Sequence, residues 1–413
     1  MRISCLYRLS RYPEVLCEAG DMLAEVEARM AEGKREEWLG FAASAWNNIA
    51  RVKSQTGRIG EAMDAYRRTR DIEIERGNRH GAANALNGIG IAHNAQGDWE
   101  AGLAAYREAL AVFREQGDKW GIAMVLTNIS NTEFASGHPE ESLASAREGL
   151  AIRREIGDRW GAALILGNIG WHQAQAGDYA EALESLGESL ADQRATGDRQ
   201  SAARTLEHIA AIHADLGDLP RAVAEIEEAC AAWESIVSPV KKFVAQVERA
   251  HILGEAGRGE EGAALLDAVL AEAAPETLRQ QGAGAWLERA WLRVSSRPKN
   301  ARDDALRAVE AARAFRQSET ESMASAALAL AESALGNHDA ALKALGARVG
   351  FPANGSFRDR LRLVEAEATV RLAAGDRTGA KAWAVGAVAL AASKGAIPAQ
   401  TRLAALAGAA DAK

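Results

Sequence analysis

Glycine recurs at a fixed interval through much of this 413-residue chain, and this spacing limits the fold more than any other feature. One series repeats every 40 residues, at Gly57, Gly97, Gly137, Gly177, Gly217 and Gly257. A second series lies midway between its members, at Gly77, Gly117, Gly157 and Gly197. Several of these glycines precede an aspartate, as in Gly97-Asp98. Glycine readily takes the left-handed conformation that ends a helix, and aspartate caps the next one. The spacing therefore predicts helices of about 17 residues, paired into one hairpin per 40-residue unit.

Apolar residues repeat inside these units at helical spacing. In the first helix of each unit, two apolar positions three residues apart hold Trp46, Leu86, Leu126, Leu166 and Leu206, then Ile49, Ile89, Ile129, Ile169 and Ile209. In the second helix, a small residue is followed four residues later by a mostly larger one, in the pairs Ala62/Tyr66, Gly102/Tyr106, Ser142/Ala146, Ala182/Leu186, Ala222/Ile226 and Gly262/Leu266. Spacings of three and four place each set on one buried helix face. The small residues are expected to let paired helices cross closely.

The order Trp/Leu–x2–Ile–Gly/Ala, then Gly-Asp, then Ala–x3–Tyr resembles the tetratricopeptide repeat. The period exceeds the usual value of about 34. It is similar to a long-helix subclass that occurs in spindle-orientation scaffolds and in sensor arrays of bacterial signal-transduction regulators. HEAT repeats have a comparable length but would not repeat Gly-Asp at both turns. The resemblance implies an all-α fold, a right-handed superhelical solenoid of helical hairpins.

The regularity of the repeat divides the chain into three stretches. We expect five regular 40-residue tetratricopeptide units over residues 37–236, a partial N-terminal hairpin or cap over 1–36, and degenerate units with a C-terminal cap over 237–413. A start within a repeat fits a piece of a longer polypeptide and a divergent cap equally well. A loop is predicted at Gly350 to Ser356. Length alone suggests two or three globular domains, but the repeat replaces them with about nine or ten hairpins.

Composition argues against several classes of partner. The 49 Lys+Arg and 57 Asp+Glu residues give a net charge of −8, which disfavours nucleic acid as a partner. Cys5, Cys17 and Cys230 form no disulfide framework and no metal-ligand spacing, which favours the cytoplasm. Arginines interrupt the N-terminal residues, so no signal peptide is predicted. The longest apolar stretch is far shorter than the roughly 18 residues of a membrane span, so no membrane partner is expected.

Enzyme signatures are missing from the sequence. It contains no P-loop, no H-E-x-x-H, no C-x-x-C and no G-x-S-x-G motif. The eight histidines are scattered, and no two stand four residues apart on one helix face. We therefore expect a non-catalytic protein without a cofactor or a metal site.

Asparagine is frequent at the first-helix positions that packing does not use. It costs about 0.5 kcal/mol relative to alanine within a helix, so its repetition calls for a compensating contact. Asn48, Asn128 and Asn168 share one register position, which Gly88 and His208 fill in two other units. In the resembled fold this face lines a concave groove. The predicted peptide-binding residues are Asn48, Arg51, Asn84, Asn87, Asn128, Asn131, Asn168, Trp171, Arg204 and His208.

Two interpretations of these amides stay open. A carboxamide both donates and accepts hydrogen bonds, so it can bind the backbone of an extended peptide. In similar repeat proteins, asparagines at this register bind peptide backbones and nearby arginines hold carboxylates. Alternatively, the amides bond to neighbouring helices and set the angle between repeats. The sequence predicts a scaffold that binds a peptide or partner segment, with the alternative of a ligand-sensing array in a larger transcriptional regulator or signal-transduction ATPase.

Overall fold

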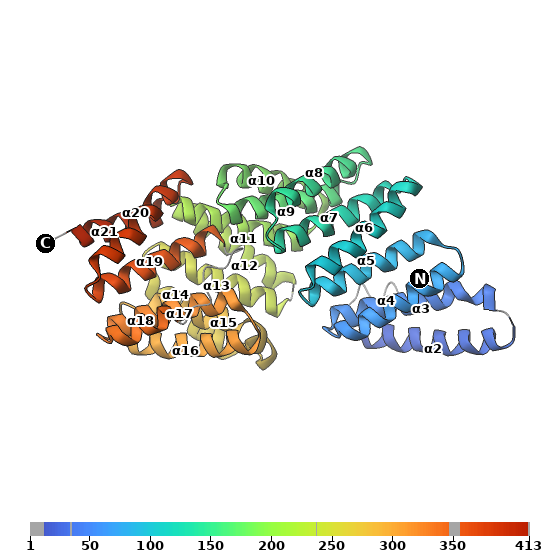
Figure 1. Ribbon diagram of the computed structural model, residues 1–413, viewed down its shortest axis with the longest axis horizontal. Coiled ribbons are helices and arrows are strands. Elements are labelled where there is room, and N and C mark those ends of the chain that lie inside the picture. Colours follow the sequence, from blue (N-terminus) through green and yellow to red (C-terminus); the bar gives the residue numbers. More distant parts are fainter. Residues whose placement is uncertain (1–11, 34, 237, 347–355, 412–413) are drawn as a thin grey trace. The chain divides into compact units, whose positions relative to one another are not determined.

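The chain is built from consecutive α-helices joined by short turns (Figure 1). The computed structural model describes residues 12–33, 35–236, 238–346 and 356–411, and these contain helices without any strand. The expected all-α solenoid of hairpins is confirmed. Cys5 and all but the last residue of the predicted loop at 350–356 lie outside the described residues.

The helices belong to two compact units, residues 1–165 and 166–413, whose boundary falls within α9 (Arg159–Ala176). Unit 1 contains α2 (Tyr12–Ala31), α3 (Arg35–Gln55), α4 (Ile59–Glu75), α5 (Arg79–Ala95), α6 (Trp99–Gln116), α7 (Lys119–Ala135) and α8 (Pro139–Glu155). Unit 2 begins with α10 (Tyr179–Thr196), α11 (Arg199–Leu216), α12 (Leu219–Ile236), α13 (Pro239–Glu255), α14 (Gly259–Glu272) and α15 (Pro275–Arg293). It continues with α16 (Pro298–Ala314), α17 (Ser318–Ala334), α18 (His338–Gly346), α19 (Phe357–Ala373), α20 (Arg377–Ser393) and α21 (Ile397–Asp411).

The turns between helices have the predicted chemistry. All ten glycines of the two series are left-handed, with φ between 66° and 86°. The side chains of Asp98, Asp118 and Asp198 each accept a backbone N–H bond at 3.0–3.2 Å and so cap α6, α7 and α11. Asp178 forms no such cap on α10, because its carboxylate pairs with Lys394. The exception marks a place where this turn meets a distant part of the chain.

The small-residue positions bring paired helices into close contact. A Cβ added to Gly170 of α9 would lie only 2.6 Å from Cγ of Leu186 in α10. One added to Gly90 of α5 would lie 2.5 Å from the Tyr106 ring in α6. Contacts this short do not occur between real side chains, so alanine would force the helices apart. Gly90 and Gly170 are the glycines that follow Ile89 and Ile169 in the repeat motif, and they allow the close helix crossing that the small residues predict.

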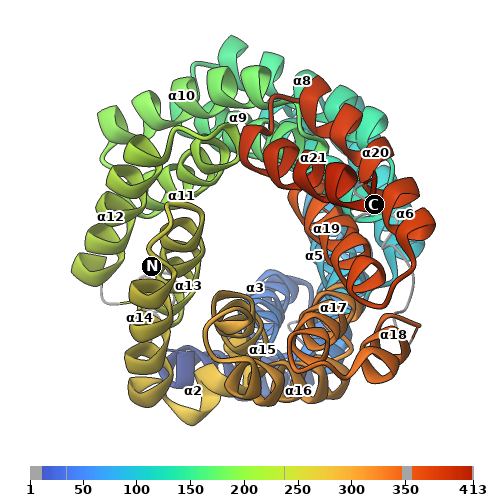
Figure 2. The same cartoon turned by 90° about the vertical axis from the view of Figure 1, so that its left-hand side faces the viewer.

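The inner helices of unit 2 follow a curve along which the last helix, α21, comes back into contact with α11. Its odd-numbered helices line an inner side and its even-numbered helices lie outside them (Figure 2). Each inner helix from α11 to α21 contacts the next, and α21 also contacts α11. Repeats of a solenoid normally touch only their neighbours in sequence. The inner helices of unit 2 therefore form a closed ring.

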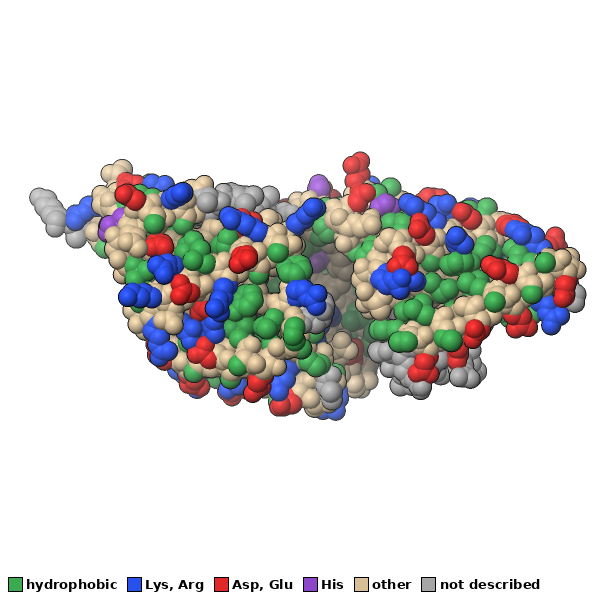
Figure 3. All heavy atoms as spheres, turned by 90° about the horizontal axis from the view of Figure 1, so that it is seen from below, with side chains coloured by type: hydrophobic (Ala, Val, Ile, Leu, Met, Phe, Trp, Pro, Cys, Tyr) green, Lys and Arg blue, Asp and Glu red, His purple; other side chains and the backbone are tan. Residues whose placement is uncertain are grey.

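The surface of the described residues carries both signs of charge. On the face drawn in Figure 3, Lys and Arg side chains are interspersed with Asp and Glu. None of the helices in the described ranges is long and apolar enough to cross a membrane.

Candidate functional site

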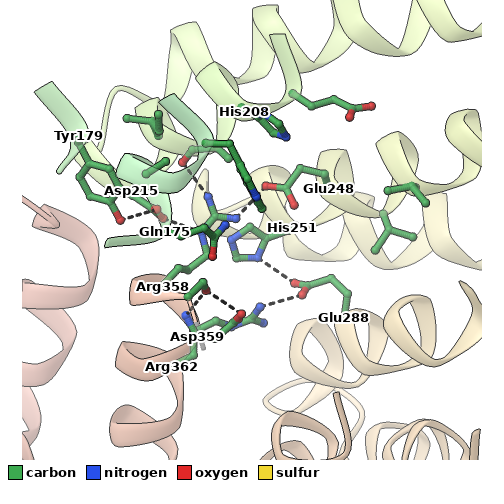
Figure 4. A pocket seen from close by; sticks show the side chains of 18 of the residues that line it. Gln175, Tyr179, His208, Asp215, Glu248, His251, Glu288, Arg358, Asp359 and Arg362 are labelled. Carbon is green, nitrogen blue, oxygen red and sulfur yellow. Dashed lines mark hydrogen bonds and ion pairs between the residues drawn. The ribbon is translucent and has the colours of Figure 1, made fainter. Parts of the chain in front are cut away.

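The ring of unit 2 encloses a cavity of about 430 Å³. Its walls come from α9, α11, α13 and α15 and from the start of α19, and Glu319 of α17 also lines it (Figure 4). Two arginines, Arg358 and Arg362, line it together with a larger number of carboxyl groups. These carboxylates belong to Glu207, Asp215, Glu248, Glu288, Glu319 and Asp359.

The 40-residue repeat itself builds one wall of this cavity. His208, Glu248 and Glu288 occupy one register position in α11, α13 and α15. Three residues further on, Ala211 and His251 occupy another, one turn along the same helix faces. Residues three apart on a helix lie side by side, so α11 and α13 each add a pair of neighbouring side chains to the wall, and α15 adds Glu288.

Arg358 is the most heavily bonded side chain of the site. Its Nε and Nη1 donate to Asp215 and Glu248, each at 2.8 Å, and its Nη2 donates to the carbonyl oxygen of Ala211 at 2.8 Å. Tyr179 donates its hydroxyl to the second oxygen of Asp215 at 2.8 Å. Ser356 caps α19 by accepting the backbone N–H of Asp359 at 3.0 Å, which helps to orient this turn toward the cavity. One guanidinium thereby joins α19 to both α11 and α13 (Figure 4).

A second cluster of ionised side chains, centred on Glu288, lies beside Arg358 in the cavity wall. Glu288 accepts from His251 Nδ1 at 3.1 Å and from Arg362 Nη1 at 3.0 Å. Burial favours the uncharged forms, yet Arg362 and His251 lower the pKa of Glu288 well below its usual range. Burial likewise opposes charge on His251, but Glu288 raises the pKa of this histidine above its ordinary value. The Arg362 guanidinium also lies 4.5 Å from the ring centroid of Trp291.

Burial raises the pKa of two other carboxyls of the cavity, those of Glu207 and Glu319. Within the described residues, no lysine or arginine forms a salt bridge with Glu207 or Glu319. Burial raises the pKa of Glu207 to about 7, although the indole N–H of Trp233 donates to this carboxylate. Burial and the nearby Asp359 raise the pKa of Glu319. These two carboxyls therefore hold their protons more readily than exposed ones do, although the charges of Lys241 and Arg204 act against this at Glu207. In the part of the chain that the structure describes, no three His, Cys, Asp or Glu side chains are placed to hold a metal ion.

An aromatic pair forms the apolar part of the wall. The Trp171 indole stacks on the His208 ring with centroids 4.2 Å apart and 25° between planes. Burial lowers the pKa of His208 to about 3, and the charge of Arg204 acts in the same direction. The imidazole is therefore neutral, and Trp171 is still 36% exposed. Val244 and Val247 continue this wall on α13.

The ten predicted binding residues are divided between two cavities and the surface. Trp171 and His208 line the cavity of unit 2, whereas Asn168 and Arg204 do not. Arg51, Asn84 and Asn87 line a separate cavity of about 640 Å³ in unit 1.

The remaining amides contact their own or adjacent helices. Asn48 donates to the carbonyl oxygen of Ser44 at 2.9 Å. Asn128 of α7 donates to the side-chain oxygen of Asn87 in α5 at 2.8 Å, which is the helix-to-helix bond of the alternative interpretation. Asn131 is exposed. Binding of a peptide by any of the ten stays a prediction.

The carboxylates of the cavity were not predicted. Glu248 and Glu288 continue the register of Asn168 and His208 at the same 40-residue interval, so extending the pattern beyond residue 236 would have found them. No repeat pattern in the sequence predicts that Arg358 lines the cavity, because its partner Asp215 lies 143 residues earlier in the chain.

Two family models match the sequence. A tetratricopeptide repeat model matches residues 41–115 and 81–155. A model of anaphase-promoting complex subunit 5 matches residues 170–234. No curated protein matches the chain.

Solved structures with a similar fold come from bacterial regulators. Aspartyl phosphate phosphatase F from Bacillus subtilis is 11% identical, with 70% of this chain and 75% of that chain covered and a TM-score of 0.57. The apo quorum sensor NprR from B. thuringiensis is 15% identical, with 82% and 97% covered and a TM-score of 0.56. Apo RapI is 13% identical, with 81% and 95% covered and a TM-score of 0.56. Identities this low show a shared fold alone.

Proposed function

We propose that this tetratricopeptide repeat protein binds a peptide or a segment of a partner protein, and that the unit 2 cavity receives a basic side chain of that ligand. The chain is a tetratricopeptide repeat protein by its family match and by its solenoid of helical hairpins. The observation that supports the proposed ligand is the excess of acidic residues around the cavity, where six carboxyl groups accompany two arginines and His251.

The charges within the cavity indicate where a ligand cation would lie. Arg358 and Arg362 are already paired with Asp215, Glu248 and Glu288. A positive group placed near Glu207 would favour the ionised form of that carboxyl, which burial otherwise disfavours. The exposed face of Trp171 offers a further attraction, because a cation over an indole ring is stabilised by its quadrupole. The cavity volume of about 430 Å³ suits a side chain with part of its backbone.

Binding without catalysis fits the lack of enzyme motifs in the sequence. One protein of similar fold is named a phosphatase, so the fold itself does not exclude an activity. Another is named a quorum sensor, and its likeness covers 97% of that chain. This likeness favours the second candidate, a ligand-sensing array that regulates an effector. A sensor requires in addition that the ligand prefer one curvature of the solenoid over another.

The proposal is tested with short peptides on the full chain. The probe acetyl-Gly-Arg-Gly-amide is titrated by calorimetry against its citrulline counterpart, which has the same shape without the charge. We expect binding of the arginine probe alone and a roughly tenfold weaker affinity in Glu207→Gln, since a charge-assisted contact is lost. Glu228→Gln is the matched control, because Glu228 is exposed and pairs with Arg194 on the outer helices.

Two results would contradict the proposal. Equal binding of the arginine and citrulline probes would show that charge is not recognised, and equal weakening by both substitutions would move the site away from the cavity. Small-angle X-ray scattering with and without the probe separates the two candidates, because a sensor changes its curvature on binding and a scaffold does not.

A further inference from the structure

Unit 1 contains a cavity of about 640 Å³ that the proposed function does not use. Its lining comes from α3, α5 and α7, and also from α4, which packs against both α3 and α5. The α4 residues of the lining, Tyr66, Thr69 and Glu73, are between 4% and 9% exposed. The cavity therefore extends between α3 and α5 as far as α4, a depth that suits a ligand side chain.

A glycine in the repeat register makes room for this cavity. Gly88 stands at the position that Asn48, Asn128 and Asn168 occupy in other units. A Cβ at Gly88 would lie 2.4 Å from the Tyr66 ring, and side chains do not approach each other so closely. The phenol ring therefore occupies the space in front of Gly88, and both residues line the cavity.

The charged residues of the lining balance one another. Arg51, Glu73 and His80 are the lining residues that can carry charge at neutral pH. Glu73 accepts from Arg76 at 3.0 Å, His80 bonds to Asp118 at 2.9 Å, and Arg51 likewise has a partner. A charged ligand group would lose its water here without gaining a free counter-charge, so the cavity favours an uncharged group.

Three carboxamides of the lining keep hydrogen-bonding groups that no described residue satisfies. The Asn47 side chain forms no hydrogen bond with any described residue. Asn87 is 8% exposed, and its oxygen accepts from Asn128 at 2.8 Å, but no described group accepts from its Nδ2. Asn84 donates to the carbonyl oxygen of His80 at 3.2 Å, and no described group donates to its own oxygen. Buried polar groups are normally hydrogen-bonded, and a ligand carboxamide offers both the acceptor and the donors that these amides lack.

We propose that the unit 1 cavity is a second binding site, which takes the side-chain carboxamide of a glutamine in a ligand peptide. The glutamine oxygen accepts from Asn87, and its amide group donates to Asn84. Its methylenes contact Ile91 and Met124, which also line the cavity. This inference goes beyond the proposed function, because the two cavities lie in different units and share no residue.

Saturation-transfer NMR titrations of the full chain test the ligand class. The probe acetyl-Gly-Gln-Gly-amide is compared with its glutamate counterpart, which has nearly the same shape but carries a charge and donates no hydrogen bond from its side chain. Acetyl-Gly-Ala-Gly-amide is the third probe and offers backbone amides alone. We expect the glutamine probe to bind at least about tenfold more tightly than either of the others, because only its side chain satisfies both Asn84 and Asn87.

Two variants test whether this binding occurs in the cavity. Asn87→Asp keeps an oxygen for the bond from Asn128 but replaces the free Nδ2 with a second oxygen. Asn47→Ala removes an amide whose loss breaks no hydrogen bond between described residues, and alanine suits a helix. Each variant should bind the glutamine probe at least about fivefold more weakly. Gln116→Glu is the matched control, because it makes the same change from amide to carboxylate at an exposed position of α6.

Three results would overturn the glutamine site. The first is binding of the glutamate or alanine probe as tight as that of the glutamine probe. The second is unchanged binding of the glutamine probe by both Asn47→Ala and Asn87→Asp. The third is equal weakening by Gln116→Glu, which would place the effect outside the cavity.

Discussion

Replacing Glu207 with glutamine should make the protein more stable and a weaker binder. The amide retains an oxygen that can accept the Trp233 N–H, so the main change is the loss of a buried ionisable group. Burial raises the pKa of Glu207 from its ordinary value of 4.5 to about 7. Such a shift corresponds to about 3 kcal/mol of folding free energy once the carboxyl is ionised in both states.

The direction of the pH dependence of stability follows from proton binding by Glu207. Between pH 4.5 and 7 the folded protein holds the Glu207 proton more tightly than the unfolded chain does, so the unmodified protein loses stability as the pH rises through this window. Glutamine does not titrate, so at this position it contributes no such change of stability with pH. We expect the unfolding free energy of Glu207→Gln to exceed that of the unmodified protein by less than about 1 kcal/mol at pH 5 and by about 3 kcal/mol at pH 8.

Urea titrations at the two pH values measure this difference. Glu228→Gln, at an exposed position, should show no change with pH beyond a few tenths of a kcal/mol. The reasoning fails if the Glu207→Gln advantage is the same at pH 5 and pH 8, or if this variant is the less stable protein at pH 8. Damage to the fold cannot mimic the expected result, because damage lowers stability and binding together.

Further substitutions address packing and the predicted amides. Gly170→Ala should destabilise unit 2 by about 1 to 2 kcal/mol, because the added Cβ would lie 2.6 Å from Leu186. Gly187→Ala, at an exposed helix position with open space around it, should instead stabilise unit 2 by about 0.5 to 1 kcal/mol. Urea titration measures both, and equal effects would contradict the close helix crossing. Asn128→Ala with Asn168→Ala should reduce co-purification of a partner from source cells several-fold if these amides bind ligand, and a partner retained undiminished would count against them.

The turns and the helix crossings could be predicted because their causes are local. A left-handed glycine followed by a capping aspartate acts within about five residues, and a small residue at a crossing repeats with the unit. Gly170 shows both the prediction and its reason, since the neighbouring Leu186 fills the space that a side chain would need.

The site could be predicted in part. Trp171 and His208 line the cavity because they follow the register that the repeat sets. The same register places Glu248 and Glu288 there, in a stretch where the glycine spacing no longer marks the units. Arg358 depends on the ring closing over 143 residues, and no local periodicity encodes a contact of that range. The sign of the charge in the cavity therefore could not be derived from the amides of the first units.

The closed ring also sets an order of events during synthesis and folding. Hairpins of adjacent helices form early, because their contacts are close in sequence and cost little loop entropy. Asp215 and Glu248 are made long before Arg358, and Asp178 is made 216 residues before Lys394. Until those cations leave the ribosome, the inner face of α11 and α13 carries its carboxylates without their partners. We therefore expect ring closure to follow the formation of the hairpins, because contacts this distant in sequence cost more loop entropy. A nascent chain that ends before residue 358 would expose the acidic face of α11 and α13.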